Sequence, residues 1–291
     1  MILITTPTGH IGSQLLSKLL VSKEKLRVLA RDPSKLSAEV KERVEVVSGS
    51  MDNAEDLARA YANVDDLFFV IPPSMKYDNA DEYYKFFGSL SLKAILVANI
   101  KRVVFVSGTG LRLDGEAGAV TSSVYVEKML EESGVSLRVL HCGTFMENLF
   151  HSVGSIKATG QFGTSCPADI KLPWVATKDI ATVAEKLMLD KAWTGFDSVG
   201  VLGPKDVSYG EIAEILSEFA RKKISYQSLS ADAVKSNAKK YGATEAAAQN
   251  LADIYSSMAR GKFNLLERTK ENSSPTDVRE WLSEHRELFG F

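Results

Sequence analysis

The chain has 291 residues, of which 45% are hydrophobic and 25% are charged, and its formal net charge is −2. This is ordinary for a globular protein of one or two closely joined domains, and it gives no electrostatic basis for binding nucleic acid or an anionic membrane. The longest apolar runs are strand-sized, far short of the roughly 20 residues that span a bilayer. Two cysteines, Cys142 and Cys166, show no metal-ligand spacing and indicate a reducing compartment. We therefore expect a cytoplasmic protein with no signal peptide and no metal site.

Short apolar runs alternate with helical patterns through the first 141 residues. Strands are predicted at Met1–Thr5, Leu26–Ala30, Val44–Ser48, Leu67–Ile71, Arg102–Ser107 and Ser136–His141. Helices are predicted at His10–Val21, Ala54–Ala62, Tyr83–Asn99 and Thr121–Ser133. Most strands are continuous apolar runs, which is typical of parallel strands that are buried on both faces. The alternation predicts an α/β fold with a doubly wound parallel sheet.

This alternation loosens after residue 142. A loop-rich stretch, Gly143–Gly163, precedes predicted helices at Thr177–Leu189, Tyr209–Ala220, Ala231–Arg260 and Thr276–Phe289, with strands at Ser198–Leu202 and Ile224–Leu229. We expect a smaller C-terminal α/β lobe packed on the sheet. The predicted domains are residues 1–142 and residues 143–291, and some segments of the second can return to the first.

The first strand is followed by "TTPTGHIG", which has the layout of a dinucleotide-binding turn. Gly9 and Gly12 fit the positions where backbone approaches a pyrophosphate and where helix packs on strand. Thr6 replaces the usual first glycine, so its φ must be negative, and Pro7 has no N–H to donate. A hydroxyl of Thr6 or Thr8 could replace the missing donor. The alternative is a plain strand-to-helix turn.

The second predicted strand ends at Arg31, in the run "ARDPSKL". A dinucleotide's adenosine ribose lies at this place in a doubly wound sheet, and a guanidinium there pairs with a 2′-phosphate. Lys35 could add a second positive charge. Position and residue type favour NADP(H) over NAD(H), although Arg31 could also form a solvated ion pair with Asp32.

The segments "TTPTGHIG", "ARDPSKL", "RVVFVSG" and "VSLRVLHCGTFMENLF" together resemble the NmrA-like branch of the atypical short-chain dehydrogenases/reductases. The resemblance covers essentially the whole chain. It implies a Rossmann domain that binds NADP(H) and a smaller C-terminal substrate lobe.

The resemblance also implies roles for particular residues. The phosphate turn would be Thr6, Pro7, Thr8, Gly9, His10 and Ile11, and the 2′-phosphate would contact Arg31 and Lys35. Asp52 would lie near the adenine, and Ile71 and Pro72 would cover the cofactor. The nicotinamide ribose would lie beside Cys142, Gly143, Thr144 and Phe145, and the substrate cleft beside Met146 and Asn148.

Catalytic machinery is not apparent in the sequence. A typical short-chain dehydrogenase uses Tyr-x-x-x-Lys, but the best candidate here, Tyr125, is followed by Met129 at the lysine position. The lysine that family members often carry four residues before the glutamate matched by Glu127 is Ser123 here. Ser107, at the end of the fifth strand, could be a further polar group at the cofactor or a turn former. Trp174 could line a cleft for a flat apolar substrate or belong to the core.

Two functions of different class fit these observations. One is an NADPH-dependent reductase that transfers hydride to a small activated apolar electrophile of the quinone, azo, imine, iminium or enone type, for which no Tyr-x-x-x-Lys motif is needed. The other is a non-catalytic NADP(H) sensor that binds a protein partner. The missing motif argues against sugar epimerases and plain alcohol dehydrogenases.

Overall fold

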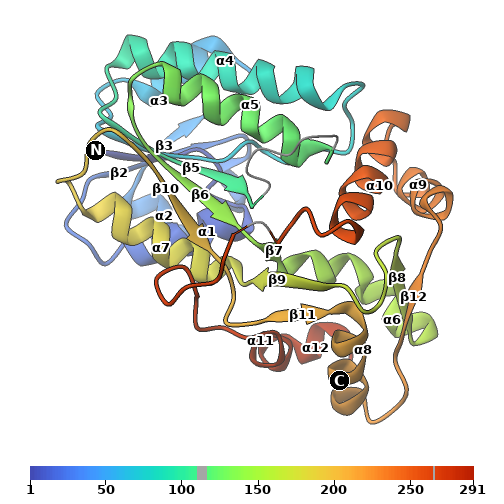
Figure 1. The fold of residues 1–291 in the computed structure, drawn as a ribbon. Helices are drawn as coiled ribbons and strands as arrows, with labels where there is room; N and C mark the ends of the chain where they lie inside the picture. Colours follow the sequence, from blue (N-terminus) through green and yellow to red (C-terminus); the bar gives the residue numbers. More distant parts are fainter. Residues whose placement is uncertain (110–116, 265) are drawn as a thin grey trace.

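The computed structural model describes residues 1–109, 117–264 and 266–291. Its centre is a seven-stranded sheet in the order β10-β6-β5-β4-β1-β2-β3 (Figure 1), and every pair of neighbours is parallel. The strands are β1 (Ile2–Ile4), β2 (Leu26–Ala30), β3 (Glu45–Ser48), β4 (Asp66–Phe69), β5 (Arg102–Gly108), β6 (Ser136–Cys142) and β10 (Phe196–Val201). The prediction of a doubly wound parallel sheet is confirmed.

Helices cover both faces of this sheet (Figure 1). One face carries α1 (His10–Leu19), α2 (Ala38–Arg43) and α7 (Thr177–Leu189), and the other carries α3 (Ala54–Tyr61), α4 (Ala80–Ala98) and α5 (Ala119–Glu132). Successive strand residues point to opposite faces, so Ile4 and Val104 join the core under α1 and α7, while Leu3 and Phe105 join the core under α3 to α5. Most strands of the sheet therefore carry apolar residues toward both faces.

A second lobe lies beyond the carboxyl end of β6 and has its own core around Trp174 and Trp281. Two small sheets belong to it, one of β7 (Thr144–Phe145), β9 (Lys171–Val175) and β11 (Asp206–Ser208), the other of β8 (Gln161–Thr164) and β12 (Ser225–Ser228). Its helices are η2 (Met146–Ser152), α6 (Val153–Thr159), α8 (Tyr209–Ala220), α9 (Ala231–Lys240), α10 (Glu245–Ala259), α11 (Val278–Glu284) and α12 (Arg286–Phe289). One further short helix, η1 (Pro33–Lys35), follows β2.

Three sequence predictions need correction here. The stretch expected to be loop-rich, Gly143–Gly163, contains β7, η2 and α6, whose short lengths left no clear periodicity. The expected helix Ala231–Arg260 is two helices, because Gly242 has a φ of +88° and Thr244 caps α10. The strand expected in the lobe at Ser198–Leu202 is β10, which pairs with β6 in the main sheet.

Helix ends follow the residue types that favour them. Asn53 accepts hydrogen bonds from the first backbone amides of α3, and Ser208 forms a capping box with Glu211 at α8. Gly134, with a φ of +77°, follows α5 at the position where helices favour glycine. No helix among the described residues is long and apolar enough to cross a membrane.

Candidate functional site at the carboxyl edge of the sheet

The order of the strands creates a switch point between β1 and β4. The chain continues from β1 toward β2 and β3 on one side, and from β4 toward β5 and β6 on the other. Ligands of open α/β sheets bind outside the carboxyl ends of the strands at such a point. Thr5, which follows β1, ties the two strands together because its hydroxyl donates to the Phe68 carbonyl at 3.2 Å. The turn Thr6–Ile11 lies directly beyond this junction.

The turn between β1 and α1 is tight. The Gly9 amide donates to the Thr6 carbonyl at 3.1 Å, and Gly9 then caps α1 without any side-chain acceptor. No acidic residue lies in the first turn of α1. The first amides of a helix have no partners within the helix, so the amino end of α1 offers N–H groups and a positive dipole to an anion.

The two glycines of this turn have different roles. A Cβ on Gly12 would lie 1.9 Å from the Thr6 carbonyl oxygen, so only glycine lets helix and strand approach this closely. A Cβ on Gly9 would lie 3.5 Å from the same oxygen, an ordinary contact, and the φ of Gly9 is −81°. Gly9 is exposed, so a side chain there would occupy the space in front of the amino end of α1.

The unusual residues of the turn adopt the conformation that the sequence requires. Thr6 is absent from the described non-glycine residues with positive φ, as predicted. Pro7 is buried and lies two residues before the cap, where its missing N–H does not interrupt the helix. Thr8 and His10 are exposed at the mouth of the turn.

Arg31 follows β2 at the same edge of the sheet. It is exposed, and no hydrogen bond or ion pair holds its guanidinium in the described part of the chain. The predicted alternative, an Arg31–Asp32 pair, is not formed. Asp32 instead caps η1 by accepting from the Ser34 amide at 3.0 Å, and its other oxygen lies 3.9 Å from the Lys35 ammonium. Those contacts lower the pKa of Asp32, with Ser34 as the main cause. Arg31 is therefore an uncommitted cation, whereas the charge of Lys35 is partly balanced.

A tyrosine that the sequence did not single out completes this end of the site. Tyr83 of α4 lies close enough to Arg31 and Asp52 for both charges to act on its hydroxyl, although burial is the main cause of its raised pKa. Its hydroxyl donates to the Pro72 carbonyl at 2.8 Å. Asp52 is exposed and Ile71 is buried in the adjacent core. The predicted residues after β2, β3 and β4 thus converge around Tyr83.

Two serines meet where β5 faces α5. The Ser107 and Ser123 hydroxyl oxygens lie 3.0 Å apart, and Ser123 also donates to the Val120 carbonyl at 2.8 Å. Because a hydroxyl has a single proton, Ser107 is the donor in the pair of serines. Ser107 can then only accept from a further group, such as a ligand hydroxyl or amide.

A buried acid and a histidine lie on the same side of the sheet. His141 is paired in register with Ser107, and its Nε2 atom lies 3.1 and 3.2 Å from the two Glu127 oxygens. Its Nδ1 atom is buried and has no partner among the described residues. Cys142 points to the opposite face, into the core under α1 and α7, and burial raises the pKa of its thiol. His141 and Cys142 are therefore not a nucleophile and its base.

The chain after β6 also offers an unused polar atom. A Cβ on Gly143 would lie 2.0 Å from the Pro173 carbonyl oxygen, so this segment runs close against β9. Thr144 is buried, and its Oγ1 atom has no hydrogen-bond partner among the described residues. Phe145 is half-buried against the core under α1 and α7. A ligand group that reached the end of β6 could form a hydrogen bond with the Thr144 hydroxyl.

Several predicted residues lie away from this edge. Tyr125 is 40% exposed on the outer side of α5 with the Lys85 ammonium over its ring, whereas the inner side carries Ser123 and Glu127. Trp174 is 1% exposed, and its indole donates to the Val207 carbonyl in the core of the lobe. Among the substrate candidates Met146 is also buried, and Asn148 is exposed.

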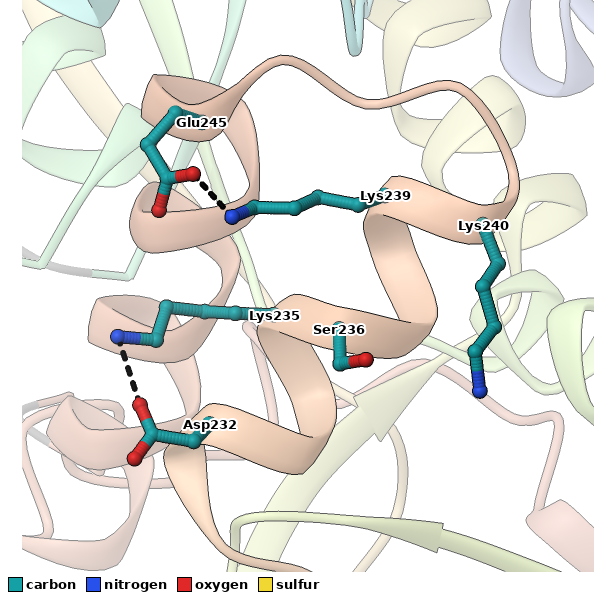
Figure 2. A pocket seen from close by; sticks show the side chains of 6 residues that line it. All are labelled: Asp232, Lys235, Ser236, Lys239, Lys240 and Glu245. Atoms are coloured by element: carbon teal, nitrogen blue, oxygen red, sulfur yellow. Dashed lines mark ion pairs between the residues drawn. The ribbon is translucent and has the colours of Figure 1, made fainter.

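A separate hollow of about 660 Å³ lies between α9 and the start of α10 (Figure 2). Lysine and acidic side chains line it, in the ion pairs Lys235–Asp232, at 2.9 Å, and Lys239–Glu245. None of the residues predicted for cofactor or substrate lines this hollow. The carboxyl edge of the main sheet therefore remains the candidate site.

Comparison with known proteins agrees with this architecture. The sequence is 26% identical over 257 residues to an NAD(P)H azoreductase of Xenophilus azovorans, a match that covers 88% of this chain and 86% of the relative. An NADPH-dependent quinone oxidoreductase of Escherichia coli, solved with NADPH, superposes with a TM-score of 0.82 at 22% identity, over 98% of this chain and 100% of the other. The triphenylmethane reductase of Citrobacter sp., solved with NADP(H), superposes with a TM-score of 0.81 at 19% identity, over 97% and 99% of the two chains. The NmrA-like family matches residues 1–282. The chain belongs to the NmrA-like family.

Proposed function

We propose that the protein is an NADPH-dependent reductase that transfers hydride to a small, activated, apolar electrophile. One observation carries this proposal. The amino end of α1 has no side-chain cap, and on the same edge of the sheet lies the Arg31 guanidinium, which has no hydrogen bond or ion pair in the described chain. Dinucleotide pyrophosphate and 2′-phosphate need these two features. The azoreductase, the quinone oxidoreductase and the triphenylmethane reductase that resemble this chain support the reaction class.

The residues of the carboxyl edge fit such a cofactor. We assign the pyrophosphate to the turn Thr6–Ile11, the 2′-phosphate to Arg31 with a minor contribution from Lys35, and the adenine to the surroundings of Asp52 and Tyr83. The nicotinamide end would lie along Ile71, Pro72, Ser107 and the segment Cys142–Phe145. Two hydroxyl groups support this end of the assignment. The Ser107 oxygen can still accept a hydrogen bond, and the buried Oγ1 atom of Thr144 has no hydrogen-bond partner among the described residues.

The proposed chemistry rests on the absence of a Tyr-x-x-x-Lys motif from the sequence and on the described residues at the edge of the sheet. Bound NADPH supplies a hydride. Ser107 accepts a hydrogen bond and thereby orients a hydroxyl or amide, but its own proton is committed to Ser123. Tyr125 faces away from the edge, so we assign it no role in proton transfer. An electrophile that is already activated, such as a quinone, azo compound, imine, iminium ion or enone, needs no side-chain acid at the moment of hydride transfer.

We propose that the substrate lies where the second lobe meets the edge of the sheet. Asn148 is exposed on η2 and is the candidate polar contact, whereas Met146 and Trp174 support the wall from within the core. In this assignment the main cofactor-binding unit is residues 1–142 together with α7 and β10, and the segment Gly143–Phe145 of the second lobe also contacts the cofactor. The rest of residues 143–291 forms the substrate lobe.

An NADPH titration followed by a panel of electrophiles tests the proposal. We expect calorimetric binding of NADPH and its oxidation by at least one quinone, azo dye or iminium ion. No binding of NADPH would refute the cofactor assignment. Tight binding without oxidation by any member of the panel would refute the reductase and favour the NADP(H) sensor, for which the missing Tyr-x-x-x-Lys motif also argues.

A further inference from the structure

A closed set of contacts joins the phosphate turn to the far end of the second lobe. We call it the Glu147 ring, and its members come from α1, η2, α7 and α11: His10, Gln14, Glu147, Phe150, Thr177 and Trp281. Of the four elements, α1, α7 and α11 are labelled in Figure 1, and η2 is the short helix that follows β7. None of the roles proposed above uses Glu147.

Glu147 is a buried carboxylate with 8% of its surface exposed. Its Oε1 atom accepts from the Thr177 hydroxyl at 2.7 Å, the Thr177 amide at 3.1 Å and the Trp281 indole at 3.2 Å. No lysine or arginine pairs with it among the described residues. A buried charge without a counter-ion is costly unless several donors and a helix dipole stabilise it. Glu147 therefore caps α7, whose own cap residue, Ala176, has no side-chain acceptor.

Gln14 links Thr177, and through it Glu147, to the phosphate turn. Its amide donates to the Thr177 hydroxyl at 2.7 Å and to the His10 carbonyl at 2.8 Å. The Thr177 hydroxyl donates to Glu147, so it must receive the Gln14 amide through its lone pairs, and the direction of every bond is fixed. The first turn of α1 is thus held by a chain of polar contacts that ends at Glu147.

Aromatic rings close the set on the other side. The Phe150 ring lies 5.8 Å from the His10 ring and 5.0 Å from the Trp281 ring, measured between centroids. His285 also stacks on Trp281 at 4.4 Å. The side chain and the carbonyl of His10, a residue of the phosphate turn, are therefore both held through residues that depend on Glu147.

We propose that Glu147 is a positioning residue that orders the first turn of α1 from within the second lobe, and so sets the affinity for NADPH. The effect on affinity rests on the proposed function. The effect on order does not, because it concerns the turn alone. A cap and a linked hydrogen bond each have effects equivalent to a few-fold change in an equilibrium.

Hydrogen exchange of the turn, measured together with NADPH affinity, tests the proposal. Glu147→Gln keeps the shape and one acceptor oxygen, Glu147→Ala removes the acceptors, and Gln14→Met breaks the polar chain on the surface of α1. We expect faster amide exchange in residues 8–16 and a roughly three- to tenfold weaker affinity for NADPH in Glu147→Ala and Gln14→Met, with a smaller change in Glu147→Gln. The matched control, Glu211→Ala, removes the acceptor of the Ser208 amide and so opens the capping box of α8 in the same lobe, and it should leave exchange in the turn unchanged.

The outcomes distinguish the claim that Glu147 orders the turn from the claim that the turn binds NADPH. Unchanged exchange in residues 8–16 in Gln14→Met and Glu147→Gln would overturn the proposal, and so would an equal change in Glu211→Ala. Purely additive effects of Gln14→Met and Glu147→Gln on exchange would also contradict it, because linked contacts must couple. If exchange changes as expected but neither the unaltered protein nor any variant binds NADPH, then Glu147 orders the turn and the proposed cofactor is wrong.

Discussion

Replacing Arg31 by alanine is the sharpest perturbation of cofactor choice that the structure offers. The guanidinium is exposed and has no hydrogen bond or ion pair in the described chain, so its removal breaks neither kind of contact and should leave the fold intact. A charge-assisted hydrogen bond contributes about 1.5–3 kcal/mol, and each 1.4 kcal/mol corresponds to tenfold in affinity. Arg31→Ala should therefore weaken NADPH binding by roughly tenfold to a hundredfold, toward the lower end because the site is exposed to solvent.

Calorimetric titration with NADPH and NADH measures this effect. NADH has no 2′-phosphate, so its affinity should change by less than about twofold in Arg31→Ala. Lys35→Ala is the matched control, because the Lys35 ammonium lies 3.9 Å from Asp32 and is already partly balanced. Its effect on NADPH should be smaller than that of Arg31→Ala. Equal losses of NADPH and NADH affinity in Arg31→Ala would refute the reasoning, because Arg31 would then not contact the 2′-phosphate.

Further predictions concern the turn, the outer helix and acid stability. Gly12→Ala should lower stability by about 1–3 kcal/mol or more in thermal unfolding, because its Cβ would lie 1.9 Å from the Thr6 carbonyl oxygen. Gly9→Ala should unfold like the unaltered protein but bind NADPH more weakly; a stability loss equal to that of Gly12→Ala would contradict this. Tyr125→Phe should leave the rate of NADPH oxidation unchanged, and a marked fall would restore Tyr125 as a proton donor. The Lys101 ammonium and the amino terminus lower the pKa of Asp65 to about 2, from an ordinary 3.8. The contacts of Asp65 therefore stabilise the folded state above about pH 4, and this stabilisation is lost as pH falls toward 2. Asp65→Asn should abolish that part of the pH dependence of the free energy of unfolding, measured by chemical denaturation.

Most of the main sheet could be predicted because most of its strands are apolar runs with a local signal. The runs that became β1, β2, β4, β5 and β6 are buried on both faces, and the helices between them begin or end at residues such as Asn53 and Gly134. The small sheets of the second lobe could not be predicted this way. The segment Lys171–Val175 pairs with two short strands distant in sequence, so its partners rather than its own pattern determine its structure.

The same distinction, between local signals and contacts with distant residues, applies to the candidate site. Gly12 and Arg31 could be identified because each follows a strand that the pattern revealed, and the parallel order then brings them to one edge. Tyr83 and Glu147 were missed because their roles come from contacts with distant residues, such as the indole of Trp281, 134 residues away from Glu147. The one local signal was an acidic residue in the mainly apolar run "FMENLF". Trp174, conversely, has a residue type common in binding clefts but lies in the core.

A single-turnover measurement tests the central claim most directly. The protein is first saturated with NADPH, then mixed with an excess of a quinone or azo dye, and the loss of reduced nicotinamide is followed by absorbance. We predict one exponential oxidation of the bound NADPH, slower when the cofactor carries deuterium at one of the two C4 positions and unchanged when it carries deuterium at the other. Persistence of bound NADPH with every activated electrophile would contradict the account, and so would an oxidation rate equal to that of free NADPH.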